Sequence, residues 1–335
     1  MKKVVILFGA NSTEHIVSCH SAQFILKEID KKKYLVDAIY ITRNQEWYYF
    51  DYDFSSLYQN EWEQTHQNDK ISNILETLKK YDVVFPVFHG KYGEDGCIQG
   101  LLEFLSLPYV GCHVTSSALC FDKVFTKEIL EHHQIPVVPY QVITKKNYSI
   151  SKLEEALGYP MIIKPARGGS SIGIQVAHNR KELIGAIHDA FQYDHKLLVE
   201  TFIQARELEC AILEKKELHA SSIGEIFSAN NFYDYDAKYN DNQTYTKIGT
   251  ELDNTVKKKI QDLSKKVFQL LDCTGLARVD FFYQEDTNTI CVNEINTLPG
   301  FTENSMFAKL LQKDHISYSK IISILIEQAL TQSKK

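Results

Sequence analysis

The sequence predicts an α/β protein that becomes α+β toward its C-terminus: a doubly wound, mostly parallel sheet followed by two smaller α+β units. Strand and helix patterns alternate through the first third of the chain, and glycines follow the strands, as is typical of such sheets. Later strand patterns are antiparallel. A length of 335 residues with 44% hydrophobic content allows more than one core. We therefore expect units at residues 1–112, 113–206 and 207–335.

The first unit is expected to bind a ligand at the carboxyl ends of its strands, where ligands of doubly wound sheets lie. Two polar, glycine-containing segments, 9–15 and 89–96, follow strands and fall at this edge. The elements that we predict for the unit are strands at 4–8, 36–41 and 83–88 and helices at 13–29, 69–80 and 98–106.

The second and third units carry shorter strands and longer loops. For the second unit we predict helices at 122–133 and 179–192 and strands at 161–164, 173–176 and 197–200. For the third we predict antiparallel strands after residue 207, a helix at 252–271, a hairpin of strands 276–283 and 289–295, and helices at 305–311 and 317–330.

Composition excludes several classes of protein. The net charge is −6 and no basic run is present, which argues against nucleic acid or an anionic membrane as the main partner. The longest apolar stretches, such as 83–88, have the length of a strand and not of a membrane span. The apolar start before Gly9 is a strand, not a signal peptide. Seven cysteines without a Cys-x-x-Cys motif indicate reduced thiols in a cytoplasmic protein.

The hairpin at 276–296 carries the most informative side chains. If the turn centres near residue 286, Arg278 lies opposite Glu294, and both share a face with Asp280 and Asn296. Asp280 and Glu294 would then be diagonal neighbours, roughly 7–8 Å apart at Cα. An all-oxygen set of Asp, Glu and Asn suits Mg²⁺. The alternative is a cross-strand Arg278–Glu294 pair that only matches charge.

Two segments of the middle of the chain suggest a nucleotide. Lys164 precedes a Gly-Gly-Ser-Ser loop, which is a reasonable phosphate cradle, although an ordinary hairpin loop would look the same. Glu200 ends a strand, and Glu207 follows seven residues later. Such carboxylates can accept hydrogen bonds from an adenine amino group and from ribose hydroxyls. The alternative is that both acids are ordinary solvated charges.

Three further segments are candidates for a site. Glu14 lies where a helix begins. It either binds a substrate ammonium group or only interacts favourably with the helix dipole. His89 and Glu94 lie in a glycine-rich run that makes a site or a plain turn. The segment 229–246 is too polar for a core strand and too aromatic for a linker, so we expect a lid that excludes water or, alternatively, a partner surface.

Taken in order, five motifs resemble the ATP-grasp superfamily and, within it, the D-alanine–D-alanine ligases. The resemblance runs from about Val4 to Leu311. The motifs are Glu14-His-x-Val-Ser18, His89-Gly-x-x-Gly-Glu-Asp-Gly96, Lys164-Pro-…-Gly-Ser-Ser-x-Gly173, Phe232-Tyr-Asp-Tyr-x-Ala-Lys-Tyr239 and Asn293-Glu-x-Asn-…-Pro-Gly-Phe-Thr302.

This resemblance implies a role for each matching residue. ATP would be bound by Lys123, Lys164, Ser171, Glu200, Thr201, Phe202, Ile203, Glu207 and Phe282. Two Mg²⁺ (or Mn²⁺) ions would be bound by Asp280, Glu294 and Asn296. D-Alanine would be bound by Glu14, His89, Lys238, Arg278, Gly300 and Ser305. The catalytic set would be Glu14, Ser170, Tyr239, Arg278 and Gly300, with Ser170 and Tyr239 tying the lid to Glu14.

The implied activity is the ATP-dependent ligation of two D-alanines through a D-alanyl phosphate, for peptidoglycan precursor synthesis. The lid around Tyr239 follows the dipeptide-forming pattern, so we expect D-alanine at the second site. The resemblance also implies a homodimer formed through the N-terminal unit. The alternatives are a ligase of D-alanine with D-serine or of another amino-acid pair, and a nucleotide-binding regulatory protein without turnover.

Overall fold

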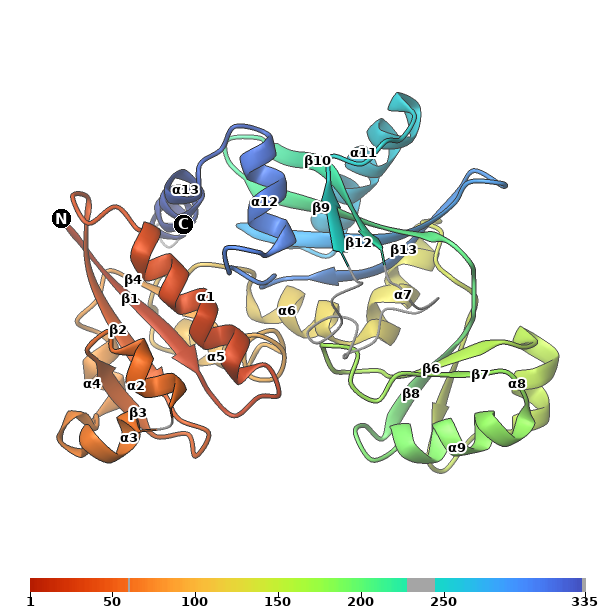
Figure 1. Ribbon diagram of the computed structural model, residues 1–335, viewed down its shortest axis with the longest axis horizontal. Coiled ribbons are helices and arrows are strands. Elements are labelled where there is room, and N and C mark those ends of the chain that lie inside the picture. The colour runs from red at the N-terminus through yellow and green to blue at the C-terminus, as the bar shows by residue number, and fades with distance from the viewer. Residues whose placement is uncertain (60, 228–244, 333–335) are drawn as a thin grey trace.

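The computed structural model describes residues 1–59, 61–227 and 245–332 of the chain. Its strands form three separate sheets, each with its own covering helices (Figure 1). None of the described helices combines the length and the apolar character that crossing a membrane requires. All seven cysteines are free thiols, as predicted, and only Cys97 among them is exposed.

The first sheet has the strand order β3-β2-β1-β4 and is doubly wound, as predicted. Strand β1 (Lys2–Gly9) pairs in parallel with β2 (Tyr34–Ile41) and with β4 (Val83–Val87). The edge strand β3 (Trp47–Phe50), which was not predicted, pairs antiparallel with β2. Both faces of β1 are buried, since Val4, Ile6 and Phe8 enter one core and Val5 and Leu7 enter another.

Helices cover both faces of the first sheet. Helix α1 (His15–Glu28) begins directly after the turn that follows β1, and α5 (Cys97–Phe104) follows the turn after β4. The predicted helix at 69–80 is shorter: α4 spans only Ile74–Leu78, because the side chain of Asn73 accepts a hydrogen bond from the Glu76 amide and starts the helix there. Short helices α2 (Phe54–Tyr58) and α3 (Trp62–Thr65) complete the unit with η1 (Gln67–Asp69).

The second sheet is antiparallel and has the order β5-β8-β6-β7. Its strands are β5 (Tyr140–Thr144), β8 (Lys196–Thr201), β6 (Met161–Pro165) and β7 (Gln175–Ala177). Helices α8 (Ile150–Leu157) and α9 (Arg180–Ala190) pack on it around a separate small core. Helices α6 (Val114–Phe121) and α7 (Lys123–His132) lie between this unit and the first (Figure 1).

The third sheet is antiparallel, in the order β11-β10-β9-β12-β13. The strands are β9 (Arg206–Glu214), β10 (Leu218–Phe227), β11 (Tyr245–Ile248), β12 (Leu276–Gln284) and β13 (Thr289–Asn296). Helix α11 (Asn254–Leu270) covers one face and α12 (Met306–Lys313) part of the other. The last helix, α13 (Tyr318–Gln332), packs on the first sheet beside α1 (Figure 1).

The register of the β12–β13 hairpin differs from the prediction. Arg278 lies opposite Asn296, and Asp280 lies directly opposite Glu294, so the expected Arg278–Glu294 and diagonal Asp280–Glu294 arrangements were wrong. Two offsets cause this: the turn pairs Gln284 with Thr289 and so centres between 286 and 287, and a register shift between Asp280 and Phe281 inserts one extra residue into β13. The four side chains still share one face, as predicted, because directly opposite residues point the same way.

Candidate active site

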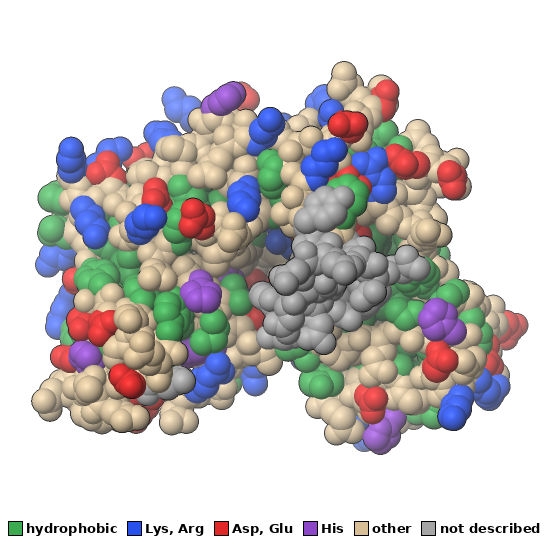
Figure 2. Space-filling model, viewed as in Figure 1, with side chains coloured by type: hydrophobic (Ala, Val, Ile, Leu, Met, Phe, Trp, Pro, Cys, Tyr) green, Lys and Arg blue, Asp and Glu red, His purple; other side chains and the backbone are tan. Residues whose placement is uncertain are grey.

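A cavity of about 1120 Å³ lies where the three units meet. Side chains from the ends of β1 and β4, from the Gly-Gly-Ser-Ser loop after β6 and from the exposed end of the third sheet line it. Over the face of the molecule in Figure 2, positive and negative side chains are interspersed. Inside the cavity, Lys123 and Lys164 come from the second unit, whereas the lining carboxylates come from the first and third units, which also supply Arg43, Arg278 and Lys309.

Glu14 joins the first unit to the glycine–serine loop. Ser170 Oγ donates a hydrogen bond of 2.5 Å to Glu14 Oε1. Glycines flank the carboxylate on both sides, because a Cβ at Gly90 would lie 2.6 Å from Glu14 Oε2 and one at Gly169 would lie 2.7 Å from it. Ser170 and Ser171 both adopt positive φ angles, 53° and 56°, which non-glycine residues rarely adopt outside functional loops. The predicted contact between Glu14 and Ser170 is therefore present.

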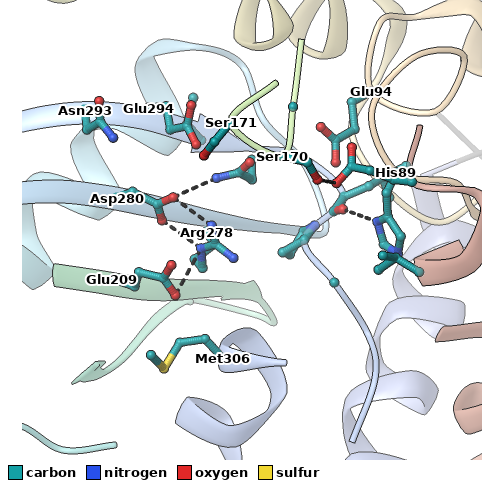
Figure 3. Close-up of a pocket in the computed structure, with 18 of the residues that line it drawn as sticks. His89, Glu94, Ser170, Ser171, Glu209, Arg278, Asp280, Asn293, Glu294 and Met306 are labelled. Carbon is teal, nitrogen blue, oxygen red and sulfur yellow. Dashed lines mark hydrogen bonds and ion pairs between the residues drawn. The ribbon is translucent and has the colours of Figure 1, made fainter. Parts of the chain in front are cut away.

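His89 fastens the first unit to the loop that follows β13. Its Nδ1 lies 3.0 Å from the carbonyl oxygen of Leu298, and its Nε2 lies 2.9 Å from Ser21 Oγ. Ser21 Oγ in turn accepts from the Phe301 amide. This network assigns the Nδ1 proton to the bond with Leu298 and makes Nε2 an acceptor. His89 thus lies at the cavity wall with its ring held on both sides (Figure 3).

Arg278 and Asp280 are the central pair among the side chains that the third sheet places in the cavity. Arg278 Nε and Nη2 each donate to one oxygen of Asp280 at 2.7 Å, and Asn296 Nδ2 donates to Asp280 Oδ2 at 3.0 Å. Glu209 approaches Arg278 from the other side, with Oε2 3.3 Å from Nε (Figure 3). Sequence reasoning missed Glu209, although it lies two residues after Glu207 in a strand and therefore faces the same way.

The side chains fit a divalent cation in the chemistry of their donors. Asp280, Glu294 and Asn296 supply carboxylate and amide oxygens on one face, which hard cations such as Mg²⁺ prefer. In the described parts of the chain, no three acidic, histidine or cysteine side chains already converge on one point. A cation that engaged Asp280 Oδ2 would have to displace Arg278 Nη2 or Asn296 Nδ2, because this oxygen already accepts from both.

The pKa of Glu207 reflects the number of carboxylates in this region. Burial raises the pKa of Glu207 to about 7; Lys164 acts against this rise, whereas Asp280 and Glu294 reinforce it. Its carboxyl lines the cavity beside Phe282, which is its direct partner across β9 and β12. A bound cation would relieve this crowding of carboxylates.

Two lysines face the carboxylates from the opposite wall. Lys123 Nζ donates to the Gly168 carbonyl at 2.7 Å and lies 3.7 Å from Glu294 Oε2. Lys164 Nζ forms an ion pair with Glu200 and donates to Asn293 Oδ1 at 3.4 Å. Both amines lie beside the glycine–serine loop, so a phosphate group in the cavity would meet two cations and the loop amides.

Glu200 is held in a buried ion-pair cluster behind this wall. Its oxygens pair with Lys164 and with Lys127, whose Nζ lies 2.6 Å away, and Lys127 and Glu200 are each 1% exposed. Burial favours a raised pKa for Glu200, but the two lysines outweigh it and lower the pKa to about 2. Lys127 was missed by sequence reasoning, although it lies one helical turn after Lys123.

The cavity brings together most of the predicted site residues. Those at its wall are Glu14, His89, Lys123, Lys164, Ser170, Ser171, Glu207, Arg278, Asp280, Phe282, Glu294, Asn296, Gly300 and Ser305. A Cβ at Gly300 would lie 2.8 Å from Ser305 Oγ, which bonds to Thr302. Glu200, Thr201, Phe202 and Ile203 do not line it. Lys238 and Tyr239 lie outside the described residues, as does most of the predicted lid at 229–246.

Comparisons with known proteins cover almost the whole chain. A family model described as "D-ala D-ala ligase N-terminus" matches residues 3–112, and one described as "D-ala D-ala ligase C-terminus" matches residues 129–327. The D-alanine–D-alanine ligase of Clostridium novyi (strain NT) is 43% identical over 342 residues, which cover 100% of this chain and 99% of the relative.

Solved structures agree with this assignment. The VanG D-Ala:D-Ser ligase from Enterococcus faecalis has a TM-score of 0.87 and 34% identity, covering 98% of this chain and 99% of that one. The D-alanine–D-alanine ligase from Bacillus anthracis complexed with ATP has a TM-score of 0.79 and 28% identity, covering 100% and 99%. The chain therefore has the ATP-grasp fold and belongs to the D-alanine–D-alanine ligase family.

Proposed function

We propose that this protein joins two D-alanines to D-alanyl-D-alanine with the conversion of ATP to ADP and phosphate. One observation carries the proposal: a single cavity gathers a carboxylate for an ammonium (Glu14), lysines for phosphates (Lys123 and Lys164) and an arginine for a developing oxyanion (Arg278). The names of the full-length relatives support the same activity. Its product would enter peptidoglycan precursor synthesis.

ATP binds, in this proposal, between the second and third units. Lys123 and Lys164 neutralise its phosphates, and the amides around Ser171 cover them. Phe282 and Glu207 meet the nucleoside, with the Glu207 carboxylate accepting from the ribose. Adenine recognition by Glu200 and the backbone at 201–203 stays a prediction, because these residues lie outside the cavity wall.

Asp280, Glu294 and Asn296 would hold the two Mg²⁺ (or Mn²⁺) ions. Bound there, divalent ions neutralise the charge of the transferring phosphoryl group. The protein's own part is to position the reactants. The carboxylate of the first D-alanine attacks the γ-phosphorus and forms an acyl phosphate with release of ADP.

The first D-alanine is placed by Glu14, whose carboxylate receives its ammonium, with His89 nearby. The neutral amine of the second D-alanine attacks the acyl phosphate, and phosphate leaves. Arg278 and the Gly300 amide stabilise the oxyanion of the tetrahedral intermediate. Lys238 and Ser305 would bind the second carboxylate, and Tyr239 would join Ser170 and Glu14 in tying down the lid, which must exclude water because an acyl phosphate hydrolyses.

D-Alanine is the proposed second substrate. The Clostridium novyi relative, which is 43% identical over 99% of its length, is a D-alanine–D-alanine ligase, whereas the VanG D-Ala:D-Ser ligase is 34% identical. The lid residue Tyr239 that supports this choice lies outside the described residues. A specificity constant for D-serine above that for D-alanine would overturn the assignment.

The test incubates the purified protein with ATP, Mg²⁺ and D-alanine and measures ADP, phosphate and dipeptide by mass spectrometry. We expect one dipeptide for each ADP, and no ADP above background when D-alanine is omitted. ATP binding without any dipeptide would refute the proposed substrate. The same proposal places the protein in the cytoplasm as a homodimer formed through the first unit, with units at 1–112, 113–206 and 207–335, which light scattering and limited proteolysis test.

A further inference from the structure

Three carboxylates lie in one row across the third sheet. Glu209 on β9 pairs with Asp280 on β12, and Asp280 pairs with Glu294 on β13. The outer two, Glu209 and Glu294, are therefore two strand spacings apart, roughly 9–10 Å at Cα. The proposed metal ligands occupy the Asp280–Glu294 side of this row. Glu209 lies on the opposite side of Asp280 from Glu294.

Arg278 lies between the two halves of the row. It holds both oxygens of Asp280 and also lies 3.3 Å from Glu209 (Figure 3). Its side chain is 14% exposed and that of Glu209 is 5% exposed, so neither charge is well solvated. A buried guanidinium that lost its only carboxylate would carry an uncompensated charge, which is strongly unfavourable.

Asp280 Oδ2 already accepts from Arg278 Nη2 and from Asn296 Nδ2, so a cation that binds this oxygen displaces one of the two donors. Cation binding and the Arg278–Asp280 pair therefore compete at this oxygen. We propose that Glu209 is a positioning residue that keeps Arg278 paired when Asp280 turns to the cation, an inference that rests on the proposed function. Arg278 then stays in the cavity, directed at the reacting carbonyl, and cation binding does not leave it unpaired.

The test measures Mn²⁺ binding directly, by the electron paramagnetic resonance signal of free Mn²⁺, with ADP present. Glu209→Gln removes the charge and keeps the size of the side chain. We expect its Mn²⁺ Kd to rise by about tenfold, because the ion pair that holds Arg278 is lost. Glu209→Asp should recover part of this loss. Glu214→Gln, the same change at the far end of β9 and outside the cavity, should leave the Kd unchanged.

A simple loss of negative charge near a cation would also weaken binding, so the second arm uses Arg278→Gln. Without the guanidinium, Asp280 has no arginine to release, and adding Glu209→Gln should then change the Mn²⁺ Kd by less than about twofold. An equal rise in both backgrounds would overturn the proposal, as would no rise in the wild-type background. Glu209→Ser carries the same expectation and replaces Glu209→Gln if that variant does not fold.

Kinetics separate this inference from the proposed activity. At saturating Mn²⁺, Glu209→Gln should lower kcat by about tenfold and leave the KM for ATP within about twofold, because Glu209 pairs with Arg278, which is not among the residues assigned to the nucleotide. Absence of dipeptide with the wild-type protein would refute the ligase activity, whatever the Mn²⁺ titrations show. Dipeptide formation with a Glu209→Gln variant that behaves as wild type would refute only the role of Glu209.

Discussion

Gly169→Ala tests the contact between the glycine–serine loop and Glu14. An alanine Cβ would lie 2.7 Å from Glu14 Oε2, whereas ordinary contact begins near 3.4 Å. The Gly169 backbone does not have the positive φ that would strain an alanine, so the new methyl group acts on the carboxylate alone. Glu14 must move by about 0.7 Å or swing away.

Glu14 is the end of a flexible side chain, so its movement costs little in folding free energy. The functional cost is larger, because Glu14 loses the 2.5 Å hydrogen bond from Ser170. A hydrogen bond to a charged group contributes about 1.5–3 kcal/mol, which corresponds to roughly a 10- to 150-fold fall in kcat/KM for D-alanine.

The assay follows ADP release while D-alanine is varied at saturating ATP, and then while ATP is varied. Gly185→Ala is the matched control, since its Cβ on α9 would meet no atom within 4 Å. We expect wild-type kinetics for the control and a slightly higher midpoint of unfolding, because alanine favours a helix. Wild-type kcat/KM for D-alanine in Gly169→Ala would refute the reasoning. An equally large rise in the KM for ATP would show that the whole loop had moved.

Three other changes have defined outcomes. Asp280→Asn should lower kcat by about 100-fold or more while the far-UV circular dichroism stays unchanged, and unchanged turnover would remove Asp280 from the metal site. Lys127→Met leaves the buried Glu200 with one lysine in place of two, so the free energy of unfolding in urea should fall by about 2–4 kcal/mol; a loss below about 0.5 kcal/mol would mean that Lys164 suffices. The pKa of Glu207 is raised from 4.5 to about 7 by burial, so its contribution to stability is complete below pH 4.5 and is lost as the pH rises through 7. Metal-free Glu207→Gln should therefore lose less stability than wild type between pH 4.5 and 7, by at most about 3 kcal/mol, and parallel urea profiles would contradict this.

The sequence was sufficient for most of the architecture because the strands alternate with helices of strong periodicity. The doubly wound sheet, the hairpin and the helices at both sides of it were all predicted. Some of the short elements, such as β3, α2 and α8, were not, since a pattern that short is hard to distinguish from a loop. The start of α4 is set by the side-chain cap at Asn73, and a broad apolar pattern does not reveal this cap.

Site residues could be predicted where sequence motifs mark them. They could not be predicted where tertiary packing determines which side chains are buried or paired. The hairpin face was correct, but its register was wrong, because neither the turn centre between 286 and 287 nor the extra residue opposite Asp280 and Phe281 leaves a signal in the sequence. Lys127 and Glu200 each look like solvated charges, and only the packing of α7 against β8 makes them a buried pair. Glu209 follows from strand alternation once Glu207 is placed, so it was accessible to the same reasoning.

Helix α13 has a consequence for how the chain is made. It is synthesised long after the first sheet, yet its Ile322 and Leu325 share a core with Val4 and Phe85 of that sheet. At the usual 5–20 residues per second, the ribosome adds α13 roughly 10–45 s after the first 112 residues have been polymerised. During that interval the nascent sheet presents bare apolar side chains beside α1. The N-terminal part of this protein therefore completes its packing only after α13 has emerged, and until then chaperone protection is most needed.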